Sequence, residues 1–157
     1  MALTLITALG LSLAAKIGGV KNLWPLLPAG LAGSVFAWCD RRNEAREGAV
    51  EVAGAVTFSL LPAAFATLAG WSAPAALALA AMMLMRSVPT VLTVRANLRI
   101  KKGRAVSTVP ALFAAGAGLI LTAWLIWLRL APWPALIFAS AFMARTIWLL
   151  GWRPRLR

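Results

Sequence analysis

All four carboxylates of this chain fall within one short stretch that is rich in arginine. They are Asp40, Glu44, Glu47 and Glu51, at spacings of four, three and four residues. Because a helix turns by about 100° per residue, these side chains would line one side of an unbroken helix. Carboxylates held close together repel one another unless they share a cation, and Mg²⁺ prefers carboxylate oxygens combined with phosphate and water. Asp40, Glu44 and Glu47 are therefore candidates for a cation or diphosphate site.

The row of four carboxylates from Asp40 to Glu51, called here the acidic stripe, has a simpler interpretation as a structural ion-pair network. Arg41, Arg42 and Arg46 are interleaved with the carboxylates and supply counterions directly. Gly48 is expected to interrupt the helix between Glu47 and Glu51, since glycine weakens a helix interior. Both interpretations, the ion-pair network and the cation or diphosphate site, remain open at this point.

A second group of charged residues forms the segment that ends with "RANLRIKKGR". Arg95 and Arg99 lie one helical turn apart on one face. We expect them to form a dense anion-binding cluster with the neighbouring basic residues Lys101, Lys102 and Arg104. The cluster either sets membrane topology and contacts lipid headgroups, or recognises a diphosphate, for which arginine offers bidentate geometry.

Arg86 stands apart because it lies within an apolar stretch. It is about eight residues inside the predicted helix end at Val94, which places it roughly 12 Å deep. A basic side chain at that depth needs a partner, and Pro89 is expected to kink the same helix. Glu51 is the carboxylate closest to this region, so we predict a buried Glu51–Arg86 ion pair. Arg145 is a second deep cation, with no partner evident in the sequence.

The composition identifies the surroundings in which these residues must lie. Of 157 residues, 62% are hydrophobic and 13% are charged, whereas soluble domains are roughly half apolar and a quarter charged. The sequence therefore predicts an all-α integral membrane protein. The net charge of +12 is distributed in short clusters between long apolar runs, which favours anionic membrane lipids over nucleic acid as a partner. The absence of histidine argues against a bound haem.

Six stretches are apolar over about the length that a membrane-spanning helix requires. We expect a single transmembrane domain over 1–157, a bundle of about six helices spanning roughly 2–20, 23–39, 49–70, 72–94, 107–129 and 132–152. Most basic residues fall in the loops near 40–48 and 95–104 and in the C-terminal tail. Because basic loops stay cytoplasmic, both termini are predicted to be cytoplasmic.

Two segments carry a resemblance to a known family. "EVAGAVTFSLLPA", beginning at Glu51, and "RSVPTVLTVRANLR", from Arg86 to Arg99, resemble the YwiC-like family of prokaryotic membrane proteins over roughly residues 38–104. The resemblance implies a multi-pass protein of the bacterial inner (cytoplasmic) membrane. Members of that family are longer, with an additional membrane segment ahead of the matched region, so the chain looks shortened at its N-terminus.

An acidic loop after a second helix is distantly similar to the UbiA-type prenyltransferases. That resemblance implies an isoprenoid diphosphate held through Mg²⁺, with Asp40 and Glu44 at the place of the first acidic motif and therefore as metal ligands. The second acidic motif of such enzymes has no counterpart here, because the corresponding region is basic.

Two functions follow from these patterns. The first is a noncatalytic accessory subunit that packs against other membrane protein subunits and retains an anionic lipid or phosphate site on its cytoplasmic face. The alternative is a UbiA-like prenyltransferase that binds an isoprenoid diphosphate through Mg²⁺. No catalytic residue is assigned, since no nucleophile can be paired with a base in a chain without histidine.

Overall fold

The chain folds into a row of helices. The computed structural model describes residues 2–42 and 48–151, with side chains from Leu9 onward. The elements are α1 (Ala2–Gly18), the 3₁₀ helix η1 (Val20–Leu23), α2 (Leu26–Arg41), α3 (Gly48–Leu68), α4 (Ala73–Lys101), α5 (Val109–Trp127) and α6 (Pro134–Gly151). No strand occurs within these ranges, and the prediction of an all-α fold is confirmed.

Four of the helices, α3 to α6, are long and apolar enough to cross a membrane. The first two are shorter than predicted, because η1 separates them and leaves 17 residues in α1 and 16 in α2. At about 1.5 Å per residue these helices reach roughly 25 Å, less than the roughly 30 Å of bilayer hydrocarbon. In contrast, α4 continues past the predicted end at Val94 to Lys101 and has 29 residues, so it is longer than a bilayer requires.

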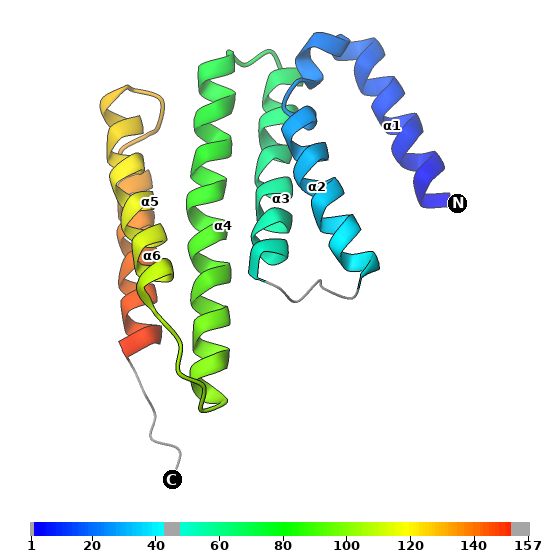
Figure 1. Cartoon of the computed structure of the whole chain (residues 1–157). Coiled ribbons are helices and arrows are strands. Elements are labelled where there is room, and N and C mark those ends of the chain that lie inside the picture. Colours follow the sequence, from blue (N-terminus) through cyan, green and yellow to red (C-terminus); the bar gives the residue numbers. More distant parts are fainter. Residues whose placement is uncertain (1, 43–47, 152–157) are drawn as a thin grey trace.

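The long helix α4 lies at the centre of the arrangement (Figure 1). The α2–α3 hairpin packs on one side of it, and the α5–α6 hairpin packs on the other. At the N-terminal edge, α1 leans away from the other helices. Helices α2, α4 and α6 run in the same direction, so the C-terminal residues of α2 and α4 come to the same end of the bundle. We call this the basic end, because Arg95 to Arg104 lie there.

Small side chains form the interface between α3 and α4. Ala63 and Ala76 have no exposed surface, and Ala66 and Ala80 are buried beside them. Small residues allow membrane helices to approach closely and to pack by dispersion forces. A similar contact joins α5 to α4, where the α-carbon of Gly118 faces the backbone of Met85. Gly118 therefore serves packing between α5 and α4 within this chain.

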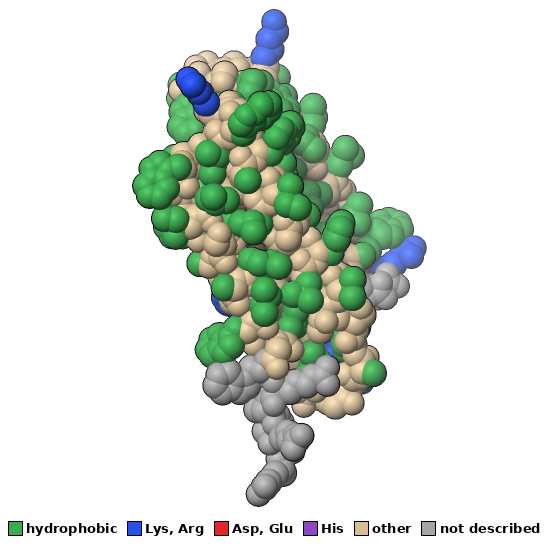
Figure 2. All heavy atoms as spheres, turned by 90° about the vertical axis from the view of Figure 1, so that its left-hand side faces the viewer, with side chains coloured by type: hydrophobic (Ala, Val, Ile, Leu, Met, Phe, Trp, Pro, Cys, Tyr) green, Lys and Arg blue, Asp and Glu red, His purple; other side chains and the backbone are tan. Residues whose placement is uncertain are grey.

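Large apolar side chains cover the outside of the bundle. Phe58, Phe65, Phe113 and Ile120 each expose 70% or more of their surface. Figure 2 shows hydrophobic side chains over most of the height of the face formed by α5 and α6. Soluble monomers rarely carry apolar patches of this extent. The surface is that of a membrane protein, in agreement with the composition.

Candidate anion-binding groove

A groove of about 870 Å³ lies between α2, α3 and α4 at the basic end. Its lining has two parts that differ in chemistry. Toward the end of the bundle the lining is basic and comes from Arg95, Arg99, Lys102 and Arg104. Toward the middle of the bundle it is apolar and includes Phe36 of α2, Phe58 of α3, and Val91, Val94 and Leu98 of α4.

The helical period of α4 produces this division. Residues 91, 94, 95, 98, 99 and 102 recur at spacings of three and four, so they share one face of the helix. The face changes from valine and leucine to arginine and lysine as α4 approaches its end. Four of the five predicted anion-binding residues therefore line one groove. The fifth, Lys101, lies on the helix but does not line the groove.

Arg104 reaches the groove because of the way α4 ends. Gly103 has φ of 72°, a left-handed conformation that glycine adopts without strain. The amide of Gly103 donates to the carbonyl of Ile100 at 2.9 Å, and that of Arg104 to the carbonyl of Arg99 at 3.1 Å. This pair of bonds is the Schellman motif, which reverses the chain after a helix. It folds Arg104 back beside Arg99.

Glu51 is the one acidic side chain that lines the groove among the described residues. Its Oε2 lies 2.9 Å from Nη1 of Arg95, and the two side chains expose 37% and 20% of their surface, respectively. The approach of α3 to α4 is close here, since a β-carbon on Gly48 would lie 3.3 Å from Nε of Arg95. Glu51 therefore joins the start of α3 to the end of α4.

The structure corrects the predicted Glu51–Arg86 pair, because Glu51 pairs with Arg95. Arg86 and Arg95 are nine residues apart on α4, a separation of about 13 Å along the helix. Packing of α3 against α4 places the first turn of α3, where Glu51 lies, beside the last turns of α4. The pair is also partly exposed rather than buried.

Replacing Glu51 with glutamine should strengthen anion binding in this groove. The substitution removes the negative charge beside Arg95, and a partly exposed pair of this kind is worth up to about 1 kcal/mol. We expect an affinity increase of a few fold for an anionic lipid, together with a stability loss of similar size. Titration of the variant and the unmodified protein with phosphatidic acid in detergent checks the sign. Weaker binding by the variant would contradict this assignment.

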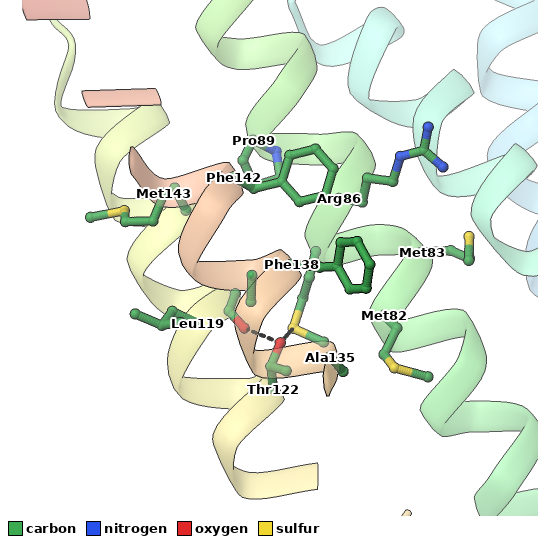
Figure 3. Close-up of a pocket in the computed structure, with 14 residues that line it drawn as sticks. Met82, Met83, Arg86, Pro89, Leu119, Thr122, Ala135, Phe138, Phe142 and Met143 are labelled. Atoms are coloured by element: carbon green, nitrogen blue, oxygen red, sulfur yellow. Dashed lines mark hydrogen bonds between the residues drawn. The ribbon is translucent and has the colours of Figure 1, made fainter. Parts of the chain in front are cut away.

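Arg86 lines a separate cleft of about 430 Å³ between α4, α5 and α6. The cleft is otherwise almost entirely apolar and is lined by Met82, Met85, Pro89, Phe138 and Phe142, among others. Figure 3 shows the guanidinium group of Arg86 pointing away from Phe142 and Leu119. The side chain is exposed, so Arg86 lies at the rim of the cleft.

Arg145 is less deep than its position in the sequence indicates. The neighbouring Thr146 contacts Thr93 of α4 through a hydroxyl hydrogen bond of 3.4 Å. Arg145 therefore lies at the level of Thr93, two residues before Arg95, where α4 changes from apolar to basic. A long arginine side chain at that level reaches the headgroup region.

The acidic stripe is described only at its two ends. Asp40 is exposed in the last turn of α2 and does not line the groove, and Glu51 is engaged by Arg95. Glu44 and Glu47, the other candidate cation or diphosphate ligands, lie outside the described residues. Within residues 2–42 and 48–151, no three His, Cys, Asp or Glu side chains come together as a metal site would require.

Comparison with known proteins identifies no relative. The chain matches no family model, no curated protein and no solved structure. The function must therefore be argued from the groove and the cleft themselves.

Proposed function

We propose that this protein is a noncatalytic, multi-pass protein of the cytoplasmic membrane that binds an anionic lipid phosphate in the groove and serves as an accessory subunit of a membrane complex. The observation that carries the proposal is the division of the groove lining. Arg95, Arg99 and Lys102 stand directly beyond an apolar surface on the same face of α4, and Arg104, just past the helix end, completes the basic lining. An amphiphile has the same division, with a phosphate headgroup above a hydrocarbon tail.

The position of the groove along α4 supports a lipid as the ligand. From Ala73 to Arg95 the helix rises over 22 residues, or about 33 Å, close to the roughly 30 Å of bilayer hydrocarbon. The basic lining therefore begins where headgroups lie. Phe58 and Leu98 are exposed, so the apolar part is open to a lipid that arrives sideways within the membrane.

The headgroup is expected to supply most of the binding energy. A lipid tail that moves from the bilayer into the groove leaves surroundings that are equally apolar, so it gains little from the hydrophobic effect. Arginine and lysine bind phosphate through charge-assisted hydrogen bonds, which are worth about 1.5–3 kcal/mol when well formed. We therefore expect selectivity for the headgroup charge and tolerance of the tail.

The direction of the bundle in the membrane follows from its charges. Arg41 and Arg42 of α2 lie at the basic end together with the lining of the groove. Since basic segments remain on the cytoplasmic side, we propose that the basic end is cytoplasmic. With α1 and α2 counted as short membrane segments, the chain has about six membrane segments and both termini on that side.

Native mass spectrometry of the detergent-purified protein tests the lipid site. We expect phosphatidic acid to bind with one strong site and phosphatidylcholine to bind without one. The double variant Arg99→Gln with Lys102→Gln should bind phosphatidic acid about a hundredfold more weakly, because each substitution removes a charged donor worth about 1.4 kcal/mol from the groove.

The matched control is Lys101→Gln with Arg41→Gln, which removes the same charge from the basic end without changing the groove lining. It should alter the affinity by less than twofold. An equal loss in both double variants would show that net charge alone attracts the lipid, and the groove would then have no role. Competition by inorganic diphosphate, added without lipid, distinguishes a site for free phosphate from a site for a lipid headgroup.

The prenyltransferase alternative makes a different prediction. It requires binding of farnesyl diphosphate that depends on Mg²⁺ and is lost when Asp40 and Glu44 are replaced by alanine. Binding that depends on Arg99 and Lys102 and persists in a chelator supports the noncatalytic function.

A further inference from the structure

Arg86 lies within the part of α4 that spans the hydrocarbon. It is 13 residues from Ala73 at one end of the span and nine from Arg95 at the other, or about 20 Å and 13 Å. A charged side chain at such a depth is costly to insert into a membrane and normally has a partner. Arg86 is nevertheless exposed on the surface of the bundle.

The described part of the chain offers Arg86 no carboxylate. Glu51 is paired with Arg95, and Asp40 lies at the exposed end of α2. All four carboxylates of the chain fall between residues 40 and 51, from the last turn of α2 to the first turn of α3. The hydroxyl of Thr90 donates to the backbone carbonyl of Arg86 at 2.6 Å, and no carboxylate among residues 2–42 and 48–151 pairs with its guanidinium group.

Beside Arg86, α4 and α6 separate. They are joined nearer the basic end by Thr93 and Thr146, and the cleft of about 430 Å³ opens farther along, between Met82, Met85, Phe138 and Phe142. Methionine is flexible and polarizable, so a surface rich in it adapts to incoming apolar side chains. Arg86 stands at the rim of this surface, is exposed, and directs its guanidinium group away from Phe142 and Leu119 (Figure 3).

We propose that the face formed by α4 and α6 around this cleft is the docking site for a transmembrane helix of another protein that carries an aspartate or glutamate at the depth of Arg86. The proposal names the partner class for the accessory role and rests on that part of the proposed function. The partner's carboxylate pairs with Arg86, and its apolar side chains enter the cleft beside Met82 and Phe138.

Charge and depth favour this occupant over two others. A second copy of this chain has no carboxylate outside residues 40–51, so it offers none in the middle of a span. The phosphate of a lipid lies near Arg95, about 13 Å from Arg86 along the helix. A carboxylate held by a membrane helix is the anion that reaches the guanidinium group at its own depth.

The test uses synthetic transmembrane peptides in vesicles that contain the full-length protein. Each peptide is a leucine-alanine helix with one glutamate placed about 13 Å from one membrane boundary, or with glutamine at the same position. Energy transfer between labelled peptide and protein in phosphatidylcholine vesicles measures association. We expect the glutamate peptide to bind at least tenfold more tightly than the glutamine peptide, and a glutamate moved two turns toward the boundary to lose this advantage.

Arg86→Met should abolish the preference for glutamate, whereas the control Arg145→Met should retain it. A variant with Glu44→Gln and Glu47→Gln should bind the peptide as the unmodified protein does.

The proposal is overturned if glutamine and glutamate peptides bind equally. It is also overturned if the variant lacking Glu44 and Glu47 binds the glutamate peptide several fold more tightly, because those carboxylates would then be the partners of Arg86. Loss of the preference when phosphatidylglycerol is added would overturn it in favour of a lipid.

The two proposals fail separately. The variant Arg99→Gln with Lys102→Gln removes the proposed lipid site and leaves the α4–α6 face unchanged. If lipid binding proves unselective while the peptide preference persists, only the groove proposal is lost. If phosphatidic acid binds as expected and the peptides show no preference, only the docking face is lost.

Discussion

Replacing Gly118 with leucine should detach α5 from α4 and destabilise the bundle by about 3 kcal/mol, the upper part of the range for overpacked positions. A β-carbon at Gly118 would lie 3.3 Å from Cβ of Met85 and 3.5 Å from its carbonyl oxygen. Met85 is four residues before Pro89, which has no amide hydrogen to donate to that carbonyl. Leucine has no room at this point unless the two helices move apart.

The separation would also weaken other contacts of α5. Ala111, Ala115 and Leu125 are buried on the same face of the helix as Gly118, and each loses contacts if α5 shifts. The apolar cleft beside Arg86, which Gly118 and Met85 both line, would change shape. The expected phenotype therefore combines lower stability with weaker association of the glutamate peptide.

Gly116 supplies the matched control, because a β-carbon there meets nothing within 4 Å. Gly116→Leu should leave the stability unchanged or raise it slightly, since leucine favours the helix more than glycine does. Unfolding in mixed micelles with increasing SDS, followed by tryptophan fluorescence, compares the two variants. Equal stability of Gly118→Leu and Gly116→Leu would show that the α4–α5 contact is not as close as described.

Lys102→Glu should reduce the affinity for phosphatidic acid by about a hundredfold. The substitution removes one charged donor from the groove and adds a carboxylate that repels the phosphate and competes for Arg99. If removal and repulsion each contribute about 1.4 kcal/mol, the combined effect is two factors of ten. Because Lys102 is exposed at the end of α4, the fold should tolerate the change.

Lys101→Glu makes the same change in net charge one residue away, outside the groove. We expect its affinity to fall by less than threefold, through the general field of the basic end. Titrations at low and high salt separate the two effects, because a general field is screened by salt more strongly than a direct contact. Similar losses in both variants at high salt would refute a specific role for the groove.

Several features of this protein can be derived from the order of its residues. The apolar composition and the absence of charge over long stretches require helices in a membrane, because isolated backbone polar groups are too costly in hydrocarbon. The basic face of α4 is also evident from the sequence, since Arg95, Arg99 and Lys102 recur at helical spacing. The apolar residues Val91, Val94 and Leu98 follow the same helical period. This pattern indicates that the helix face with the basic cluster continues as an apolar surface, which is the division seen in the groove.

The tertiary structure decided which residues meet across helices. The sequence allows Glu51 to pair with any cation near the basic end. The position of α3 along the axis of α4 selects Arg95. That position depends on close packing of Ala63 and Ala66 with Ala76 and Ala80. Because alanines recur at similar spacing in both helices, the sequence alone would permit other positions of α3 along α4. Phe36 and Phe58 enter the groove for the same reason, from helices whose sequences carry no anion-binding signal.

The depth of each arginine was likewise decided by packing. Arg86 and Arg145 both lie within apolar stretches of the sequence, yet the Thr93–Thr146 contact places Arg145 near the basic end and leaves Arg86 deep beside a cleft. Sequence determines how far a residue lies along its own helix, because the rise per residue is constant. The rotation and offset of one helix against another depend on many small contacts from residues far apart in the chain, and these decide which charges find partners within the bundle.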